Sequence, residues 1–288
     1  MKNIFKANLL LVSIMLISFL FQMSIAFFIP KQIGDYLDQY IMLLIPCIIF
    51  ILFNKKNIKS TLKLNRLSRK HLISVILIAI LIQPIVIMIA EIGAIIFGAP
   101  IAEYISEIQS YGFLPMIIIV GITPAICEEV LFRGVVLDGY SQYSPLKAAL
   151  FNGLLFGAFH ANFQQFFYTF LMGIILALVV QGSNSIYSGM IIHLINNTWS
   201  DIWSQISPKS FDATMNFVYS GGIYGRFIWL IVGIISMFGV VKIIGNLFQE
   251  KIQTSAIYYE GGESFSNWPF WTFIGMCSFI SILMMIGQ

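Results

Sequence analysis

Charged side chains are scarce in this sequence. Lys, Arg, Asp and Glu together make up 10% of the 288 residues, whereas hydrophobic residues make up 58%. An average soluble domain has about 25% charged residues, so the composition excludes a chain built mainly of soluble domains. Apolar runs of about 20 residues, the length needed to cross a hydrocarbon core of about 30 Å, recur along nearly the whole sequence. We therefore predict an all-α fold, a polytopic transmembrane bundle of about eight or nine helices.

Cysteine is also rare, and so are the spacings that cysteine-based sites require. Cys47, Cys127 and Cys277 all lie within apolar runs and have no metal-ligand spacing. We interpret them as buried thiols. No internal repeat or low-complexity tract is evident in the sequence.

Acidic residues are missing from the one strongly basic segment, residues 54–70. Short loops rich in Lys and Arg stay on the cytoplasmic side of a membrane, which explains this segment without nucleic-acid binding. The loop at 99–111 has acidic residues and no basic one, as an external loop does. We predict a multi-pass protein of the cell membrane with a cytoplasmic N-terminus and an external C-terminus. The abundance of Ile, Lys and Asn hints at a bacterial cytoplasmic membrane. The basic residues are Lys55, Lys56, Lys59, Lys63, Arg66, Arg69 and Lys70.

The apolar runs divide the chain into three expected parts. These are N-terminal transmembrane helices with the basic loop over 1–112, a functional helical core over 113–205, and C-terminal transmembrane helices over 206–288. The first run is longer than the apolar region of a signal peptide, so we interpret it as a retained helix. Residues 207–224 and 249–267 have the mixed composition of loops. Helices are expected near 7–29, 38–53, 72–97, 113–139, 146–161, 164–181, 186–206, 225–247 and 267–287.

Polar side chains within the predicted helices are few. A charge at the bilayer centre costs about 2.5–3.5 kcal/mol, so it is retained only where it faces protein or a wet cavity. Glu128 and Glu129 diverge by about 100° on a helix, while Glu129 and Arg133 share a face and suit an ion pair. Glu128 is the candidate general base, and Pro124 is expected to kink its helix. The intramembrane polar residues are Glu91, Glu128, Glu129, Arg133, Asn152, His160, His193, Asn196, Asn197 and Asp201.

Two histidines are candidates to act with Glu128. A turn centred near Ser144 would fold the helix carrying His160 antiparallel to the helix carrying Glu128, with each residue sixteen positions from the turn. A carboxylate and an imidazole at one depth can hold a water molecule between them. His193 and Asn197, at positions i and i+4, can donate hydrogen bonds to a developing oxyanion. The same spacing equally suits polar contacts that tie membrane helices together.

Three motifs, "EEVLFR", "FGAFH" and "HLINN", resemble in sequence order the signature motifs of the CPBP intramembrane protease family. This family includes the CAAX prenyl proteases and the bacterial Abi-type proteins. The resemblance covers about a third of the chain and implies an intramembrane endopeptidase. It implies that Glu128 and His160 activate the attacking water, that His193 and Asn197 stabilise the oxyanion, that Glu129 and Arg133 support the site, and that Phe156 packs beside His160.

The resemblance leaves the cofactor open. The family is conventionally called a metalloprotease family, and Glu128, His160 and His193 could bind Zn²⁺ with water as fourth ligand. The same residues could act on water without a metal, and we favour this second interpretation. Expected partners are a protein or peptide substrate at the membrane and the lipid bilayer.

Two other functions stay open: a non-proteolytic adaptor, for example in bacteriocin immunity or signalling, and a transporter or proton relay using carboxylates such as Glu91.

Overall fold

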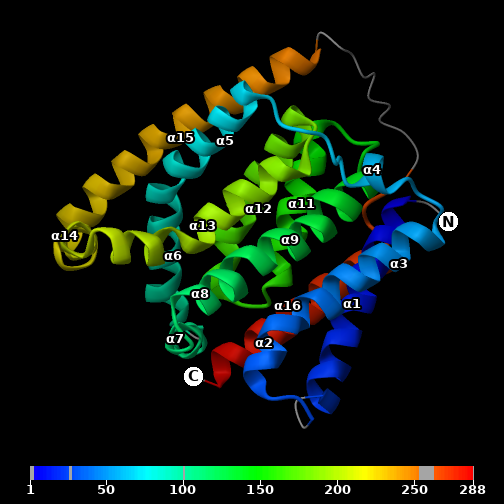
Figure 1. Cartoon of the computed structure of the whole chain (residues 1–288), viewed down its shortest axis with the longest axis horizontal. Helices are drawn as coiled ribbons and strands as arrows, with labels where there is room; N and C mark the ends of the chain where they lie inside the picture. The colour runs from blue at the N-terminus through cyan, green and yellow to red at the C-terminus, as the bar shows by residue number, and fades with distance from the viewer. Residues whose placement is uncertain (1–2, 26–27, 100, 253–262, 288) are drawn as a thin grey trace.

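A computed structural model describes residues 3–25, 28–99, 101–252 and 263–287. All regular elements in these ranges are helices, and no strand occurs in them, which confirms the all-α prediction. Seven helical segments there are long and apolar enough to cross a membrane, so the chain is a polytopic helical bundle (Figure 1). These segments are Asn3–Phe21, Lys31–Phe53, Arg69–Phe97, Phe113–Gly139, Phe163–Ser183, Gly222–Gln249 and Trp268–Ile286.

The N-terminal part forms three of these crossings. The second crossing contains a π-helical stretch, and the third is divided just before Pro84, which has no N–H to continue the helical ladder. A short helix in the basic segment connects the second crossing to the third. The elements are α1 (Asn3–Ile25), α2 (Lys31–Gln39), η1 (Tyr40–Leu44), α3 (Ile45–Phe53), α4 (Ile58–Thr61), α5 (Arg69–Leu81) and α6 (Gln83–Phe97).

The crossing over 113–139 alternates between α-helix and π-helix. Such π-helical stretches often occur at functional sites, and this crossing carries the first motif. Three further helices, which correspond to the predicted runs at 146–161, 164–181 and 186–206, pack around it. The elements are α8 (Phe113–Met116), η2 (Ile117–Ile122), α9 (Thr123–Glu129), η3 (Val130–Val136), α10 (Leu137–Gly139), α11 (Pro145–Phe159), α12 (Phe163–Ser183) and α13 (Ile186–Ile206).

Two stretches that were expected to be loops are helical instead. Helix α7 (Ala102–Ser110) lies within the expected loop at 99–111, and α14 (Pro208–Ser220) within the stretch at 207–224. Both are too short and too polar to stand out as apolar runs. The last two helices are α15 (Gly222–Ile252) and α16 (Trp268–Ile286), and residues 253–262 of the remaining predicted loop lie outside the described residues.

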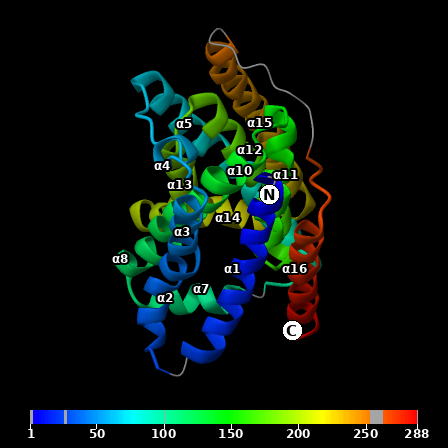
Figure 2. The same ribbon diagram turned by 90° about the vertical axis from the view of Figure 1, so that its right-hand side faces the viewer.

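Two large apolar cores and one small cluster, between α7, α8 and η2, hold the described residues together. The first core joins α1, α3, η3, α11 and α16, and the second joins α5, α6, α12, α13 and α15. Figure 2 shows α1 and α16 side by side. Helices α11 and α12 approach closely because Gly153 and Gly173 face each other, and a Cβ on Gly173 would lie 2.6 Å from Gly153 Cα. This contact packs α12 directly against the helix that carries the second motif.

The two ends of the bundle differ in their elements. At one end lie the start of α1, the segment 54–68 and the turn between α12 and α13, where Asn65 Nδ2 donates to Asn184 O at 2.8 Å. We call this the basic end. At the opposite end lie α7, α14 and the end of α16 (Figure 1). There Gln109 Nε2 donates to Asp201 Oδ1 at 2.9 Å, and Lys31 pairs with Glu107. We call this the α7 end.

Candidate active site

A cavity of about 440 Å³ lies within the bundle, and its wall includes residues of all three motifs. Glu128 from α9, Phe156 and His160 from the end of α11, and His193 and Asn197 from α13 all line it. The fold therefore brings together five residues that the sequence analysis selected. The other two, Glu129 and Arg133, lie behind the wall and are fully buried.

The ion pair expected from the spacing of Glu129 and Arg133 is present. Arg133 Nη1 lies 2.9 Å from Glu129 Oε1, and neither side chain is exposed. The guanidinium also lies over the ring of Phe156, at 4.2 Å from its centre, and its Nη2 donates to Gly173 O at 3.4 Å. A buried pair with these extra partners fixes the crossing that carries Glu128 against α11 and α12.

His193 joins the two glutamates. Its Nδ1 lies 2.9 Å from Glu129 Oε1, and its Nε2 lies 3.8 Å from Glu128 Oε2. Since a carboxylate only accepts hydrogen bonds, Nδ1 is the donor to Glu129. The sequence analysis did not predict this bond, because it joins two helices far apart in the chain. Glu129 therefore orients the imidazole that faces Glu128.

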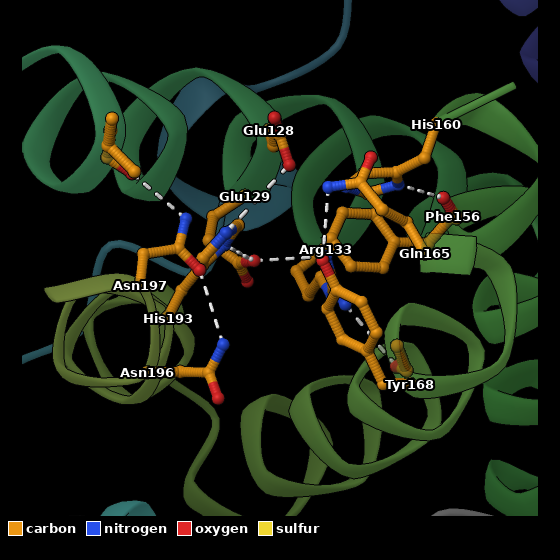
Figure 3. A network of polar contacts seen from close by, with 12 residues as sticks. Glu128, Glu129, Arg133, Phe156, His160, Gln165, Tyr168, His193, Asn196 and Asn197 are labelled. Carbon is orange, nitrogen blue, oxygen red and sulfur yellow. Dashed lines mark hydrogen bonds and ion pairs between the residues drawn. The ribbon is translucent and has the colours of Figure 1, made fainter. Parts of the chain in front are cut away.

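Glu128 and His160 face the cavity from different helices. Glu128 is 7% exposed, and its Oε2 has no hydrogen-bond partner among the described residues. His160 follows the last residue of α11, and its Nδ1 lies 2.9 Å from Phe156 O. Because a carbonyl accepts, Nδ1 donates and Nε2 is left to accept from the cavity. In Figure 3 the Glu128 carboxylate lies between the rings of His193 and His160.

Phe156 contacts both histidines and the buried arginine of the site. Its ring centre is 5.0 Å from that of His160 and 5.9 Å from that of His193, with an edge-to-face arrangement in both contacts. The Arg133 guanidinium lies over the same ring. The aromatic ring therefore limits the positions that these three groups can take.

Asn197 and Pro124 act on the same backbone group. Pro124 has no N–H and cannot donate to Val120 O, the carbonyl four residues before it. Asn197 Nδ2 donates to that oxygen at 2.9 Å, and Asn196 Nδ2 donates to Asn197 Oδ1 at 3.2 Å (Figure 3). Asn197 thus replaces the missing backbone donor and ties α13 to η2. One N–H of its amide is committed to this contact, which leaves the other for a ligand.

Several further polar residues of the cavity, among them Gln165, Tyr168 and Asn196, had no role assigned from sequence. Gln165 Nε2 donates to the Tyr168 hydroxyl at 3.0 Å on α12, and Asn196 lies beside the third motif. Asn196 appears among the intramembrane polar residues, but Gln165 and Tyr168 belong to no motif. Their isolated polar groups in an otherwise apolar helix were the only signal in the sequence.

The remaining intramembrane polar residues have partners outside the cavity. Glu91 Oε1 accepts from Arg226 Nη2 of α15 at 3.3 Å, which gives this unassigned carboxylate an ion pair. Asn152 Nδ2 donates to Phe132 O at 2.7 Å, and Asp201 accepts from Gln109. None of the three lines the cavity. They hold helices together, as polar groups in membrane bundles do.

The predicted zinc ligands do not form a ligand group in this arrangement. Among the described residues, no set of three or more His, Cys, Asp or Glu side chains is placed to hold a metal ion. The fixed Nδ1 atoms of His160 and His193 would suit metal ligation through Nε2. The positions of these two rings relative to Glu128 do not suit binding of one shared metal ion. We therefore derive no catalytic step through a metal.

Residues 110–199 match the model of one protein family, described as the type II CAAX prenyl endopeptidase Rce1-like family. The matched segment contains the three motifs and most of the cavity-lining residues of α9, α11, α12 and α13. The match confirms the resemblance stated from the motifs. Comparisons with curated proteins and with solved structures found no match.

Proposed function

We propose that this chain, with a CAAX prenyl endopeptidase segment at its centre, hydrolyses a peptide bond of a membrane-associated substrate inside the cavity. One observation supports this most strongly: the Glu128 carboxylate lies in the cavity wall, 3.8 Å from His193 Nε2, and its Oε2 has no protein hydrogen-bond partner. Burying a carboxylate oxygen without a hydrogen-bond partner costs free energy. A general base needs a carboxylate oxygen that is free to accept a proton.

The proposed first step is the removal of a proton from water. A water molecule held between Glu128 and His160 Nε2 gives its proton to the Glu128 carboxylate, and its oxygen attacks the scissile carbonyl carbon. Glu128 then carries the proton that the departing amine requires. The Tyr168 hydroxyl, held by Gln165, lies in the same wall (Figure 3). Water supplies both the hydroxyl of the new carboxyl group and the proton of the new amine.

The proposed stabilisation of the oxyanion comes from α13. Asn197 has one amide N–H that is not committed to Val120 O, and His193 Nε2 lies beside Glu128 in the same wall. This N–H, and a hydrogen on His193 Nε2, donate to the developing oxyanion.

The polar groups of the cavity fit a peptide backbone. Four buried acceptor oxygens in its wall have no hydrogen-bond partner among the described residues, although buried acceptors are usually satisfied. The wall contains no Lys or Arg among its lining residues. An extended peptide supplies N–H donors at regular intervals, which these acceptors need. The four atoms are Gln39 Oε1, Glu128 Oε2, Gln164 Oε1 and Asn196 Oδ1.

We also propose that the reaction proceeds without a metal ion. The step described above needs only Glu128, His160 and water. Cleavage by purified protein should therefore persist after treatment with a strong zinc chelator, and metal analysis of the active protein should find less than one zinc per chain. Loss of activity on chelation, with recovery on adding Zn²⁺, would show instead that Glu128, His160 and His193 move together around a metal.

The proposal is tested by comparing new peptide termini in membranes. Membranes from cells that express the full chain are compared with membranes containing Glu128→Gln or His160→Ala at equal abundance, with Glu91→Gln as the matched control. We expect termini that appear with the wild type and Glu91→Gln and disappear with both site variants. If Glu128→Gln and His160→Ala retain both these termini and the biological activity, the protein is a non-proteolytic membrane partner.

A further inference from the structure

The lining residues of the cavity lie mainly towards one end of the bundle. On α12 they run from Gln164, next to the start of the helix, to Leu176, and on α13 they run from His193 to Ser200, towards its end. Beyond these, the wall is completed by Tyr104 of α7 and Met215 of α14. The α7 end of the bundle therefore forms the rim of the cavity.

The basic end is closed above the site. Leu62 of the basic segment is buried and packs against Gly134 of η3, so closely that a Cβ on this glycine would press on the Leu62 side chain. The segment is held across the bundle by hydrogen bonds to the turn before α13: Ser185 Oγ donates to Asn65 O at 2.6 Å, and Ile186 N donates to Lys63 O at 3.1 Å. A substrate cannot reach Glu128 from this end without displacing the segment.

Positive charge differs strongly between the two ends. The basic end carries the seven Lys and Arg residues of 55–70 and also Lys6 and Lys147. The α7 end has Lys31, Lys209 and Arg226, and two of these are paired, Lys31 with Glu107 and Arg226 with Glu91. An excess of Lys and Arg in short loops marks the cytoplasmic side of a membrane protein. The charge pattern thus places the basic end in the cytoplasm.

We infer that the mouth of the catalytic cavity faces the extracytoplasmic side of the membrane. This inference deepens the proposed proteolytic function and rests on it for the nature of the site. The substrate class is then a membrane-associated segment whose scissile bond enters from the outer face, for example a translocated peptide still held by the bilayer. The cytoplasmic tail of an inner-leaflet protein does not reach Glu128, because the basic segment closes that end.

Thiol labelling in sealed cells that express the full chain tests the orientation. The native cysteines are buried, which leaves a low background for single introduced cysteines. Ser106→Cys places a thiol on the exposed surface of α7, Ile105→Cys places one in the cavity rim, and Lys59→Cys reports on the basic end. Each variant is treated with a membrane-impermeant thiol reagent before and after permeabilisation.

We expect Ser106→Cys and Ile105→Cys to react in sealed cells at least 10-fold faster than Lys59→Cys, which should react only after permeabilisation. Modification of Ile105→Cys should stop cleavage, while modification of Ser106→Cys should not. The opposite labelling order would overturn the inference even if proteolysis is intact. If no variant or wild type cleaves any peptide, the proposed function fails, yet the labelling order still decides which side the cavity faces.

Discussion

Arg133 offers the sharpest test of how the buried charges are held. The substitution Arg133→Met keeps much of the side-chain volume and removes the partner of Glu129, which is 0% exposed and 2.9 Å away. Removing one member of a buried ion pair costs about 3–5 kcal/mol, because the remaining charge has no compensation. At about 2–4 °C per kcal/mol for a chain of this size class, the melting temperature should fall by about 6–20 °C.

The matched control is the double variant Glu129→Gln with Arg133→Met. It removes both charges and retains a side-chain carbonyl that can accept from His193 Nδ1, so much of the lost stability should return. Thermal unfolding of the purified chain in detergent, followed by tryptophan fluorescence, measures both variants. If Arg133→Met unfolds within about 1 °C of the wild type, or the double variant is less stable than the single one, the reasoning about buried charge is wrong.

Three further predictions follow from individual contacts. Gly189→Ala would place a methyl group against the Glu129 carboxylate and 2.9 Å from Val180 Cγ2, so overpacking should lower stability by about 1–3 kcal/mol and reduce cleavage. Its control is Gly275→Ala, which meets nothing within 4 Å and should leave both unchanged or raise stability slightly. Asn197→Ala removes the side-chain donor to Val120 O and should lower the free energy of unfolding by about 1–3 kcal/mol, measured by thermal unfolding. In the cleavage assay, kcat should fall by a larger factor than KM changes. Glu91→Gln breaks a partly exposed pair, so it should cost less than about 1 kcal/mol and retain cleavage; proton or solute transport in proteoliposomes that disappears with it would favour a transporter instead.

The membrane crossings could be predicted well from the sequence. Each of the nine predicted apolar runs corresponds to a helical segment, and seven of them correspond to segments that are long and apolar enough to cross a membrane. The runs at 146–161 and 186–206 form helices that are not among these seven. A bilayer imposes a length and an apolar composition that are visible locally. The helices α7 and α14 were missed for the same reason. They are short and partly polar, and they rim the cavity at the α7 end rather than span the bundle. Nothing in the local sequence of either predicts that position.

The site was predictable in part. The spacing of Glu129 and Arg133 indicates their pairing, since both lie on one stretch of helix. The bond from His193 to Glu129 was not predictable, because it depends on how α13 packs against α9. The partner of Val120 O was also hidden: Pro124 shows that a carbonyl is left free, but only the fold shows that Asn197 donates to it.

The most direct test of the account is the cleavage rate of purified Glu128→Gln. A substrate identified from the membrane termini is incubated with wild type, Glu128→Gln and the control Glu91→Gln in proteoliposomes, after each protein is shown to have the same melting temperature. Loss of a general base should lower kcat by about 10²–10⁴-fold in Glu128→Gln and leave Glu91→Gln near the wild-type rate. A Glu128→Gln protein that cleaves at the wild-type rate would contradict the assignment of Glu128 as the base.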